Sequence, residues 1–171
     1  QLRPFNELFL KPAEDGSSID VFRISSNKDL EDAIADSVDP RRAFILEESI
    51  DFKELTVPIL SGRCLPAVEI KTSESFYNFN AKYLNEDTQL TELVLSEDKK
   101  NELEEICLKT LDVMGCSGWL RVDLMQDRKN NFYVLEVNTA PGMTSHSLFP
   151  KSAESIGLSY NDLVQEIINA K

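Results

Sequence analysis

Residues 118–138 read GWLRVDLMQDRKNNFYVLEVN and predict the hairpin around which the rest of the fold is arranged. Two apolar runs flank the polar turn DRKNN, and both alternate as strands do, because successive strand side chains point to opposite faces. With the turn centred on Lys129–Asn130, Val122 falls opposite Val137. One face of the hairpin is then expected to be wholly apolar and to pack into a core.

The other face of this hairpin is expected to gather Arg121, Asp123, Glu136 and Asn138 within reach of one another. Asp123 falls opposite Glu136, and like charges directly opposite destabilise a sheet. A bound divalent cation would remove the repulsion, and oxygen ligands of this kind favour Mg2+ or Mn2+ over zinc. The alternative is a solvent-facing surface on which Arg121 pairs with an acid.

The segment TAPGMTSHS that follows the hairpin is unusual for a strand end. Pro141–Gly142 is either a plain turn or a bend that turns the backbone N–H of Gly142 toward an oxyanion. His146, the single histidine, is more typical of a hydrogen-bonded structural residue than of a base.

Composition narrows the classes of function. The 171 residues carry 18 Lys and Arg against 30 Asp and Glu, a net charge of −12. Such a charge argues against general nucleic-acid binding, which needs a basic stripe, but suits Mg2+. No apolar run has the length of a membrane span. The three scattered cysteines fit core positions in a reducing cytoplasm, and together with one histidine they lack the ligand spacing of a zinc site.

The order of elements predicts an α+β fold with mostly antiparallel strands. Strands are expected at 6–12, 19–24 and 43–49, with a pair over 55–70 about a Ser61–Gly62 turn. Helices are expected over 25–38 and 96–114, with a short helical turn after Pro150. A last helix is expected from Ser159, with Leu163, Val164, Ile167 and Ile168 on one face. Residues 76–93 lack a clean period and predict a long loop, which in compact domains is often functional.

Other polar residues are weaker candidates on pattern alone. Lys11 precedes a Gly-Ser-Ser loop that suits phosphates but equally suits an ordinary hairpin turn. Glu47 and Glu48 follow an apolar run, where acids can bind adenine or ribose but more often face solvent. Lys82 and Tyr83 lie in the predicted long loop, where the alternative is surface packing.

Five segments together resemble the D-alanine–D-alanine ligases of the ATP-grasp superfamily: KPAEDGSS, ILEE, FYNFNAKYLNEDTQ, GCSGWLRVDLM and LEVNTAPGMTSHSLFP. The similarity extends from about Phe9 to the end of the chain. It implies an ATP-grasp fold from which the family's N-terminal domain is absent. Residues 1–54 would be the remainder of the central subdomain, and residues 55–171 the C-terminal subdomain with the metal and substrate sites.

The resemblance implies an ATP- and Mg2+-dependent (or Mn2+-dependent) ligation of two D-alanines for peptidoglycan synthesis. One carboxylate would become an acyl phosphate that the second amine attacks. The family further implies a cytoplasmic homodimer formed through the N-terminal domain, with no membrane or nucleic-acid partner. The 171 residues alone are expected to be inactive. Alternatives are a D-alanine–D-lactate ligase and a non-catalytic Mg-nucleotide module.

The resemblance also assigns roles to single residues. Residues implied to contact ATP are Lys11, Glu47, Glu48, Ile50, Glu54, Phe76, Lys82 and Asn138. Those implied in catalysis or lid closure are Ser17, Tyr83, Arg121 and Gly142. The implied metal ligands are Asp123, Glu136 and Asn138. Those implied to hold the second D-alanine are Ser147 and Leu148. Two departures from the family are Glu48, where many members have lysine, and Asp20, where glycine is usual.

Overall fold

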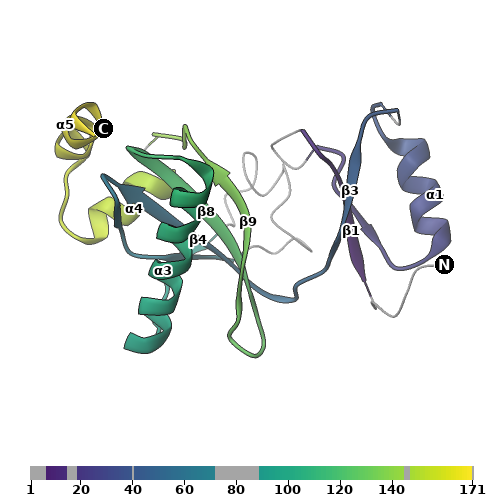
Figure 1. Cartoon of the computed structure of the whole chain (residues 1–171), viewed down its shortest axis with the longest axis horizontal. Helices are drawn as coiled ribbons and strands as arrows, with labels where there is room; N and C mark the ends of the chain where they lie inside the picture. Colours follow the sequence, from purple (N-terminus) through teal and green to yellow (C-terminus); the bar gives the residue numbers. More distant parts are fainter. Residues whose placement is uncertain (1–6, 15–18, 40, 72–88, 145–146, 171) are drawn as a thin grey trace. The chain divides into compact units, whose positions relative to one another are not determined.

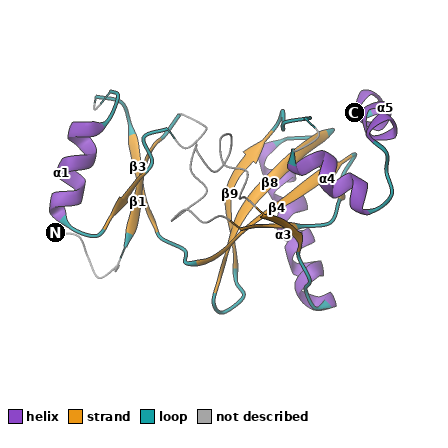
Figure 2. Ribbon diagram, turned by 180° about the vertical axis from the view of Figure 1, so that it is seen from behind, coloured by secondary structure: helices purple, strands orange, loops and turns teal. Residues whose placement is uncertain are grey.

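The computed structural model describes residues 7–14, 19–39, 41–71, 89–144 and 147–170 (Figures 1 and 2). These residues form two compact units, the first reaching Ile50 and the second containing Asp51–Lys71 and the residues from Gln89 onward. Glu54, the last residue of the first predicted subdomain, lies within a strand of the second unit. No helix in the described ranges is long and apolar enough to cross a membrane.

The first unit is a three-stranded antiparallel sheet with one helix along it (Figure 1). The sheet has the order β2-β1-β3, from strands β1 (Leu8–Pro12), β2 (Phe22–Ile24) and β3 (Phe44–Glu48). Helix α1 (Asn27–Asp36) starts with a capping box at Ser26, which satisfies backbone N–H groups at its first turn. Leu8, Leu10, Ile24 and Ala33 form the core between sheet and helix.

The second unit is built on a larger antiparallel sheet of order β7-β6-β4-β8-β9, with β5 paired to β4. Its strands are β4 (Phe52–Leu60), β5 (Arg63–Cys64), β6 (Val68–Lys71), β7 (Gln89–Glu92), β8 (Trp119–Asp127) and β9 (Phe132–Asn138). Helix α3 (Glu97–Met114) lies across one face of this sheet (Figure 1). Its Leu103, Cys107 and Leu111 pack against alternate residues of β4 and β8, which form the main core.

Two shorter helices, α4 (Leu148–Ser155) and α5 (Tyr160–Asn169), complete the second unit. Phe149 and Leu163 are fully buried with Leu60 in a separate apolar cluster. Trp119 meets Phe149 edge to face, with 5.7 Å between ring centroids. This cluster anchors both helices to the end of the sheet at which β4 ends and β8 begins.

The predicted α+β class and antiparallel pairing are confirmed, with four corrections. The strand expected after the Ser61–Gly62 turn is two strands, β5 and β6, because Pro66 cannot donate a hydrogen bond to the ladder. The end of the predicted long loop forms strand β7. Helix α4 begins before Pro150, which lies in its first turn, where its missing N–H has no intrahelical partner to lose. Ile168, predicted on the same face of α5 as Leu163, is 76% exposed, whereas Leu163 is fully buried.

Candidate active site

The β8–β9 hairpin has the predicted register at its site end. Val122 pairs with Val137, Asp123 pairs with Glu136, and Arg121 pairs with Asn138. Alternate residues share a face of a strand, so the four polar side chains are presented on one face. That face is opposite to the one that packs on α3, to which Val122 contributes.

The hairpin departs from the prediction beyond Asp123, where the next pair is Leu124 with Val134 and Leu135 is an extra residue on β9. Such a β-bulge leaves one residue unpaired and bends the strand. Tyr133 and Leu135, which the alternation places on the apolar face with Val137, are 42% and 37% exposed, so the expected wholly apolar packed face is wrong at this end. Val137 still packs against the core, which keeps the site end of β9 fixed.

Asp123 is the centre of the polar cluster and is only 4% exposed. Arg121 donates to both of its oxygens, from Nε to Oδ1 and from Nη2 to Oδ2, each at 2.7 Å. The Thr56 hydroxyl donates to Oδ1 at 2.6 Å, and the Asn138 amide donates to Oδ2 at 2.9 Å. The ion pair of Arg121 with an acid is therefore present. A buried carboxylate needs such partners, because burial without them costs several kcal/mol.

Asn138 connects the two acids. Its Nδ2 lies 2.9 Å from Asp123 Oδ2 and 3.4 Å from Glu136 Oε1, so the two carboxylates converge on one point. Among the described residues no three His, Cys, Asp or Glu side chains gather as a metal site, so this set consists of two carboxylates and one amide. Mg2+ in nucleotide sites takes one or two carboxylates and completes its shell with phosphates and water. The donor set fits Mg2+ or Mn2+.

In the described part of the loop between β9 and α4, Ser147 is bonded to Thr144. Its hydroxyl accepts a hydrogen bond from the backbone N–H of Thr144 at 3.0 Å and also lies 2.9 Å from the Thr144 hydroxyl. A Cβ placed on Gly142 would lie 3.0 Å from Ser147 Oγ, so a side chain at this position would push the serine hydroxyl away. The structure therefore brings two predicted site residues, Gly142 and Ser147, into contact. Leu148 is 6% exposed, so its side chain belongs to the core.

The same loop is also bonded to helix α5. The Tyr160 hydroxyl donates to the backbone carbonyl of Met143 at 2.8 Å. Because Leu163, on the same helix, is fully buried, the helix that supplies this bond is itself fixed. His146, predicted to support the loop, lies outside the described residues.

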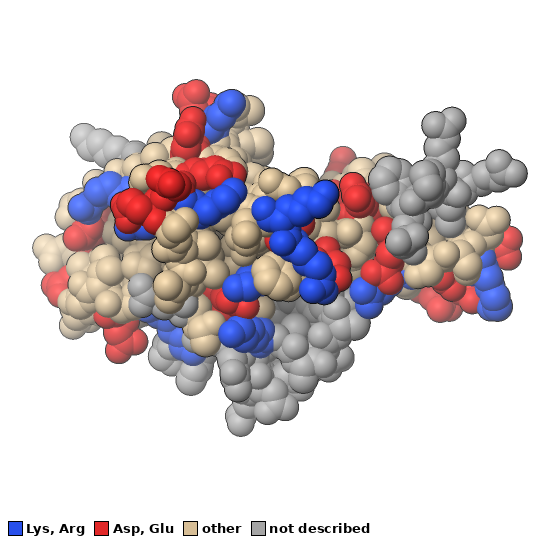
Figure 3. Space-filling model, turned by 90° about the horizontal axis from the view of Figure 1, so that it is seen from below, with Lys and Arg blue, Asp and Glu red and all other residues tan. Residues whose placement is uncertain are grey.

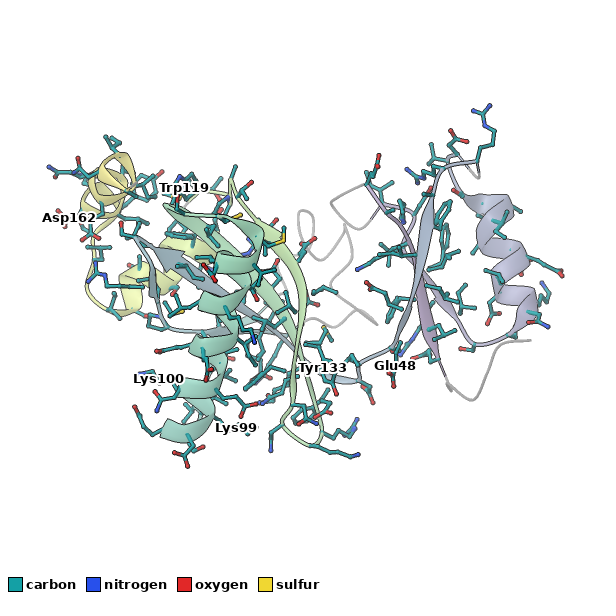
Figure 4. All side chains as sticks on the ribbon, in the orientation of Figure 1. Glu48, Lys99, Lys100, Trp119, Tyr133 and Asp162 are labelled. Atoms are coloured by element: carbon teal, nitrogen blue, oxygen red, sulfur yellow. The ribbon has the colours of Figure 1, made fainter. Side chains whose placement is uncertain are left out.

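Lys11 and Glu47, both predicted to contact ATP, meet in the first unit. They lie on adjacent strands, and Lys11 Nζ is 2.7 Å from Glu47 Oε2. Glu48 ends β3, is exposed and belongs to the other face of the sheet, which it shares with Leu8 (Figure 4). The two neighbouring glutamates thus point to opposite faces, and only Glu47 shares a face with Lys11.

Asp20, which stands where the family usually has glycine, has a backbone φ of 55°. This left-handed conformation favours glycine, although aspartate tolerates it better than most residues. Here the Asp20 carboxylate accepts hydrogen bonds from the Ser37 hydroxyl at 2.9 Å and the Val38 N–H at 2.8 Å, and it pairs with Arg42. These bonds explain how a side chain is accommodated at this position.

The remaining predicted residues divide into two groups. Ile50 and Glu54 are described, at the junction of the two units and within β4 respectively, while four others lie outside the described residues: Ser17, Phe76, Lys82 and Tyr83. Sequence reasoning missed Thr56, although a lone hydroxyl within the apolar run LTVPIL is a recognisable sign of a buried polar contact.

Charge on the surface is mixed. On the face shown in Figure 3, lysine and arginine side chains are interspersed with aspartate and glutamate. The negative net charge of −12 is therefore not gathered into a single acidic patch on that face.

Comparison with known proteins identifies the family. The family model "D-ala D-ala ligase C-terminus" matches residues 6–169. The D-alanine–D-alanine ligase of Haemophilus ducreyi is 41% identical over 161 residues, which cover 94% of this chain and 53% of that protein. The chain thus spans about half the length of the relatives it matches.

Two solved structures give the same fold. D-alanine–D-alanine ligase from Bacillus anthracis complexed with ATP has a TM-score of 0.80 and 29% identity, covering 95% of this chain and 51% of that one. VanG D-Ala:D-Ser ligase from Enterococcus faecalis has a TM-score of 0.81 and 28% identity, covering 95% of this chain and 48% of that one. The predicted ATP-grasp fold is confirmed, and the chain belongs to the D-alanine–D-alanine ligase family, whose C-terminal part it represents.

Proposed function

We propose that the chain is the C-terminal part of an ATP-dependent ligase that joins two D-alanines to D-alanyl-D-alanine for peptidoglycan synthesis. The observation that carries the proposal is the cluster of Arg121, Asp123, Glu136 and Asn138 on one face of the hairpin in a chain of this family. Each member has a chemical task in carboxylate activation by ATP. In the predicted route the carboxylate of the first D-alanine takes the γ-phosphoryl group of ATP and ADP is released. The amine of the second D-alanine then attacks the carbonyl of this acyl phosphate, and phosphate leaves.

The acids and the amide would hold Mg2+ or Mn2+. Asp123, Glu136 and Asn138 supply the oxygen ligands, and the bound cation would neutralise charge on the phosphates of ATP. Asn138 would turn its amide oxygen toward the cation, since amide oxygens and not amide nitrogens bind Mg2+. The buried position of Asp123 limits the orientations that its carboxylate can take.

Arg121 and Gly142 would act on the substrate oxygens. A guanidinium provides fixed, permanently charged donors, and a backbone N–H costs no reorganisation as charge develops. The contact of Gly142 with Ser147 keeps the loop narrow at this point. Ser147, and the backbone at Leu148, would orient the second D-alanine, so that its amine approaches in a fixed direction.

Residues predicted to hold ATP keep that role in the proposal. Lys11 would exchange Glu47 for the phosphates, because the two groups in their present pair are partly exposed and such pairs are weak. Glu47, Ile50, Glu54 and the backbone at Glu48 would line the adenine and ribose. Phe76 would stack near the nucleotide, and Lys82 would reach the phosphates. Ser17 would lie near the reacting centre, where Tyr83 of the closing loop would bond to it. A cytoplasmic location and dimerisation through the family's N-terminal domain are also proposed.

The test is phosphate release by the full-length protein with ATP, Mg2+ and D-alanine. Glu136→Gln is expected to lower turnover at least a hundredfold, because it removes a charged metal ligand. The fold should stay intact, because Glu136 is exposed. The matched control is Glu166→Gln, which breaks only an exposed pair with Arg63 and should leave the rate unchanged. Absence of D-alanine-dependent phosphate release from the wild-type protein would overturn the proposal. Binding of Mg-ATP without turnover would support a non-catalytic module instead.

A competition experiment between candidate second substrates tests which of them the enzyme joins to D-alanine. Similarity to a D-Ala:D-Ser ligase makes D-serine a relevant competitor, and the alternative of a D-alanine–D-lactate ligase adds D-lactate. Incubation with equal D-alanine, D-serine and D-lactate, followed by mass analysis, is expected to yield D-alanyl-D-alanine as the main product. A predominance of the ester product would favour the D-lactate ligase.

A further inference from the structure

Thr56 is a buried hydroxyl in an otherwise apolar part of the sheet. Residues 55–60 of β4 are all buried, and Thr56 is the only one of them with a polar side chain. It is completely inaccessible to solvent. A hydroxyl in such a place destabilises the fold unless it is hydrogen-bonded. Its partner therefore indicates what the hydroxyl is for.

That partner is Asp123. The two residues are directly paired across the antiparallel strands β4 and β8, and Thr56 Oγ1 donates to Asp123 Oδ1 at 2.6 Å. Strand β4 lies inside the sheet, between β6 and β8, so its backbone is held on both sides. Thr56 is also branched at Cβ, which restricts rotation of the side chain that carries the hydroxyl. The donor is thus fixed in position and uncharged.

The other donors to Asp123 are of a different kind. Arg121 and Asn138 are both predicted to interact with substrate or cation, and each would have to change partners to do so. Thr56 lies on an inner strand of the sheet and is fully buried, and within the described part of the chain its side chain is bonded to Asp123. It is the donor that can stay in place when the other two move.

We propose that Thr56 is a positioning residue that fixes the orientation of the Asp123 carboxylate for a divalent cation. The inference rests on the proposed function, because it takes Asp123 as a metal ligand. Partners of this kind orient a ligating carboxylate, and their removal weakens metal binding or activity by about 10- to 100-fold. Without Thr56, the carboxylate would be oriented only by Arg121 and Asn138, the two donors that are predicted to change partners.

The experiment compares Thr56→Val with Thr56→Ser in the full-length protein. Valine keeps the shape and branching but lacks the hydroxyl, and serine keeps the hydroxyl. Mn2+ alone is titrated in the absence of ATP, and free Mn2+ is followed by electron paramagnetic resonance. We expect the valine variant to bind Mn2+ at least tenfold more weakly and the serine variant to lie within about threefold of the wild type.

A steady-state measurement separates positioning from a purely structural role. The Mg2+ concentration for half-maximal rate should rise in Thr56→Val, while KM for D-alanine stays within about twofold. Near-ultraviolet circular dichroism checks that the fold is kept. If the valine variant does not fold, Thr56→Ala, which removes the hydroxyl without adding an apolar methyl beside the carboxylate, is measured in its place with the same expectation.

Two outcomes overturn the inference and are distinguishable. If the wild type binds Mn2+ and ligates D-alanine, and the folded valine or alanine variant binds Mn2+ equally well, the positioning role is refuted while the proposed function stands. If the wild type binds no Mn2+ at all, both the metal site and the role of Thr56 are refuted. A loss in the serine variant as large as in valine would also contradict the role of the hydroxyl.

Discussion

Replacing Arg121 by methionine tests how the site keeps a carboxylate buried. The side chains of Arg121 and Asp123 are 15% and 6% exposed, and their two hydrogen bonds are both 2.7 Å long. Removing one partner of a buried pair typically costs 3–5 kcal/mol, because the other charge is left uncompensated. Thr56 and Asn138 still donate to Asp123, so we expect the lower limit, about 3 kcal/mol, and a fall in Tm of roughly 10 °C.

Unfolding of this unit can be followed by a built-in probe. Trp119 is the only tryptophan of the chain, and it packs edge to face on Phe149 inside the second unit. Its fluorescence during urea or thermal unfolding therefore reports on the unit that holds Arg121. The matched control is Arg63→Met, which breaks a 3.5 Å pair between largely exposed groups and should cost less than about 0.5 kcal/mol.

Added Mg2+ supplies a second readout. In the wild type the Arg121 guanidinium already compensates Asp123, whereas in the methionine variant a bound cation would be the main positive charge near that carboxylate. Mg2+ should therefore raise the Tm of Arg121→Met more than that of the wild type. If the free energies of unfolding of wild type and variant agree within about 0.5 kcal/mol, the view that this ion pair keeps Asp123 buried is refuted.

Three further predictions concern other parts of the chain. Gly142→Ala should lower kcat/KM for D-alanine about tenfold, since its Cβ would meet the Ser147 hydroxyl at 3.0 Å, and Ser147→Ala in the same protein should relieve that particular contact. A hydrogen bond from Cys107 lowers the pKa of the Cys64 thiol and, with burial, raises that of Cys107, so iodoacetamide at pH 8 should label Cys64 before Cys107. Cys107→Ala should raise the pKa of Cys64 and slow its labelling severalfold at that pH, whereas Cys107→Ser, which keeps a donor, should slow it less. Ser26→Ala should destabilise the first unit by about 1 kcal/mol through loss of the helix cap, measured by circular dichroism during urea unfolding.

Much of the hairpin could be predicted because a period of two fixes which residues face each other. The pairing of Val122 with Val137 and of Asp123 with Glu136 follows from the turn and the alternation alone. The bulge at Leu135 could not be predicted, because an extra residue on an edge strand costs little and leaves the local composition unchanged.

The other wrong predictions share a physical cause: pairing with a neighbouring strand determined the local structure. Strand β7 has a mixed sequence that becomes a strand only by pairing with β6. Pro66 breaks its strand because the ladder needs an N–H at that point. In the site, the sequence left open whether Arg121 would pair with an acid, and the fold has that pair. Thr56 was overlooked because a hydroxyl is neutral and its importance depends on the strand beside it.

The bond from the Tyr160 hydroxyl to the carbonyl of Met143 has a practical consequence for anyone who modifies this protein. Helix α5 is far along the chain from the hairpin, yet it supports the loop that contains Gly142. A fusion partner, a tag or a shortened version that disturbs α5 should therefore change activity while the sheet itself remains folded. A loss of activity in such versions would reflect a change in the loop that contains Gly142, and not a change at Asp123 or Glu136. Versions that keep residues 160–169 undisturbed are the sound starting point for enzymology.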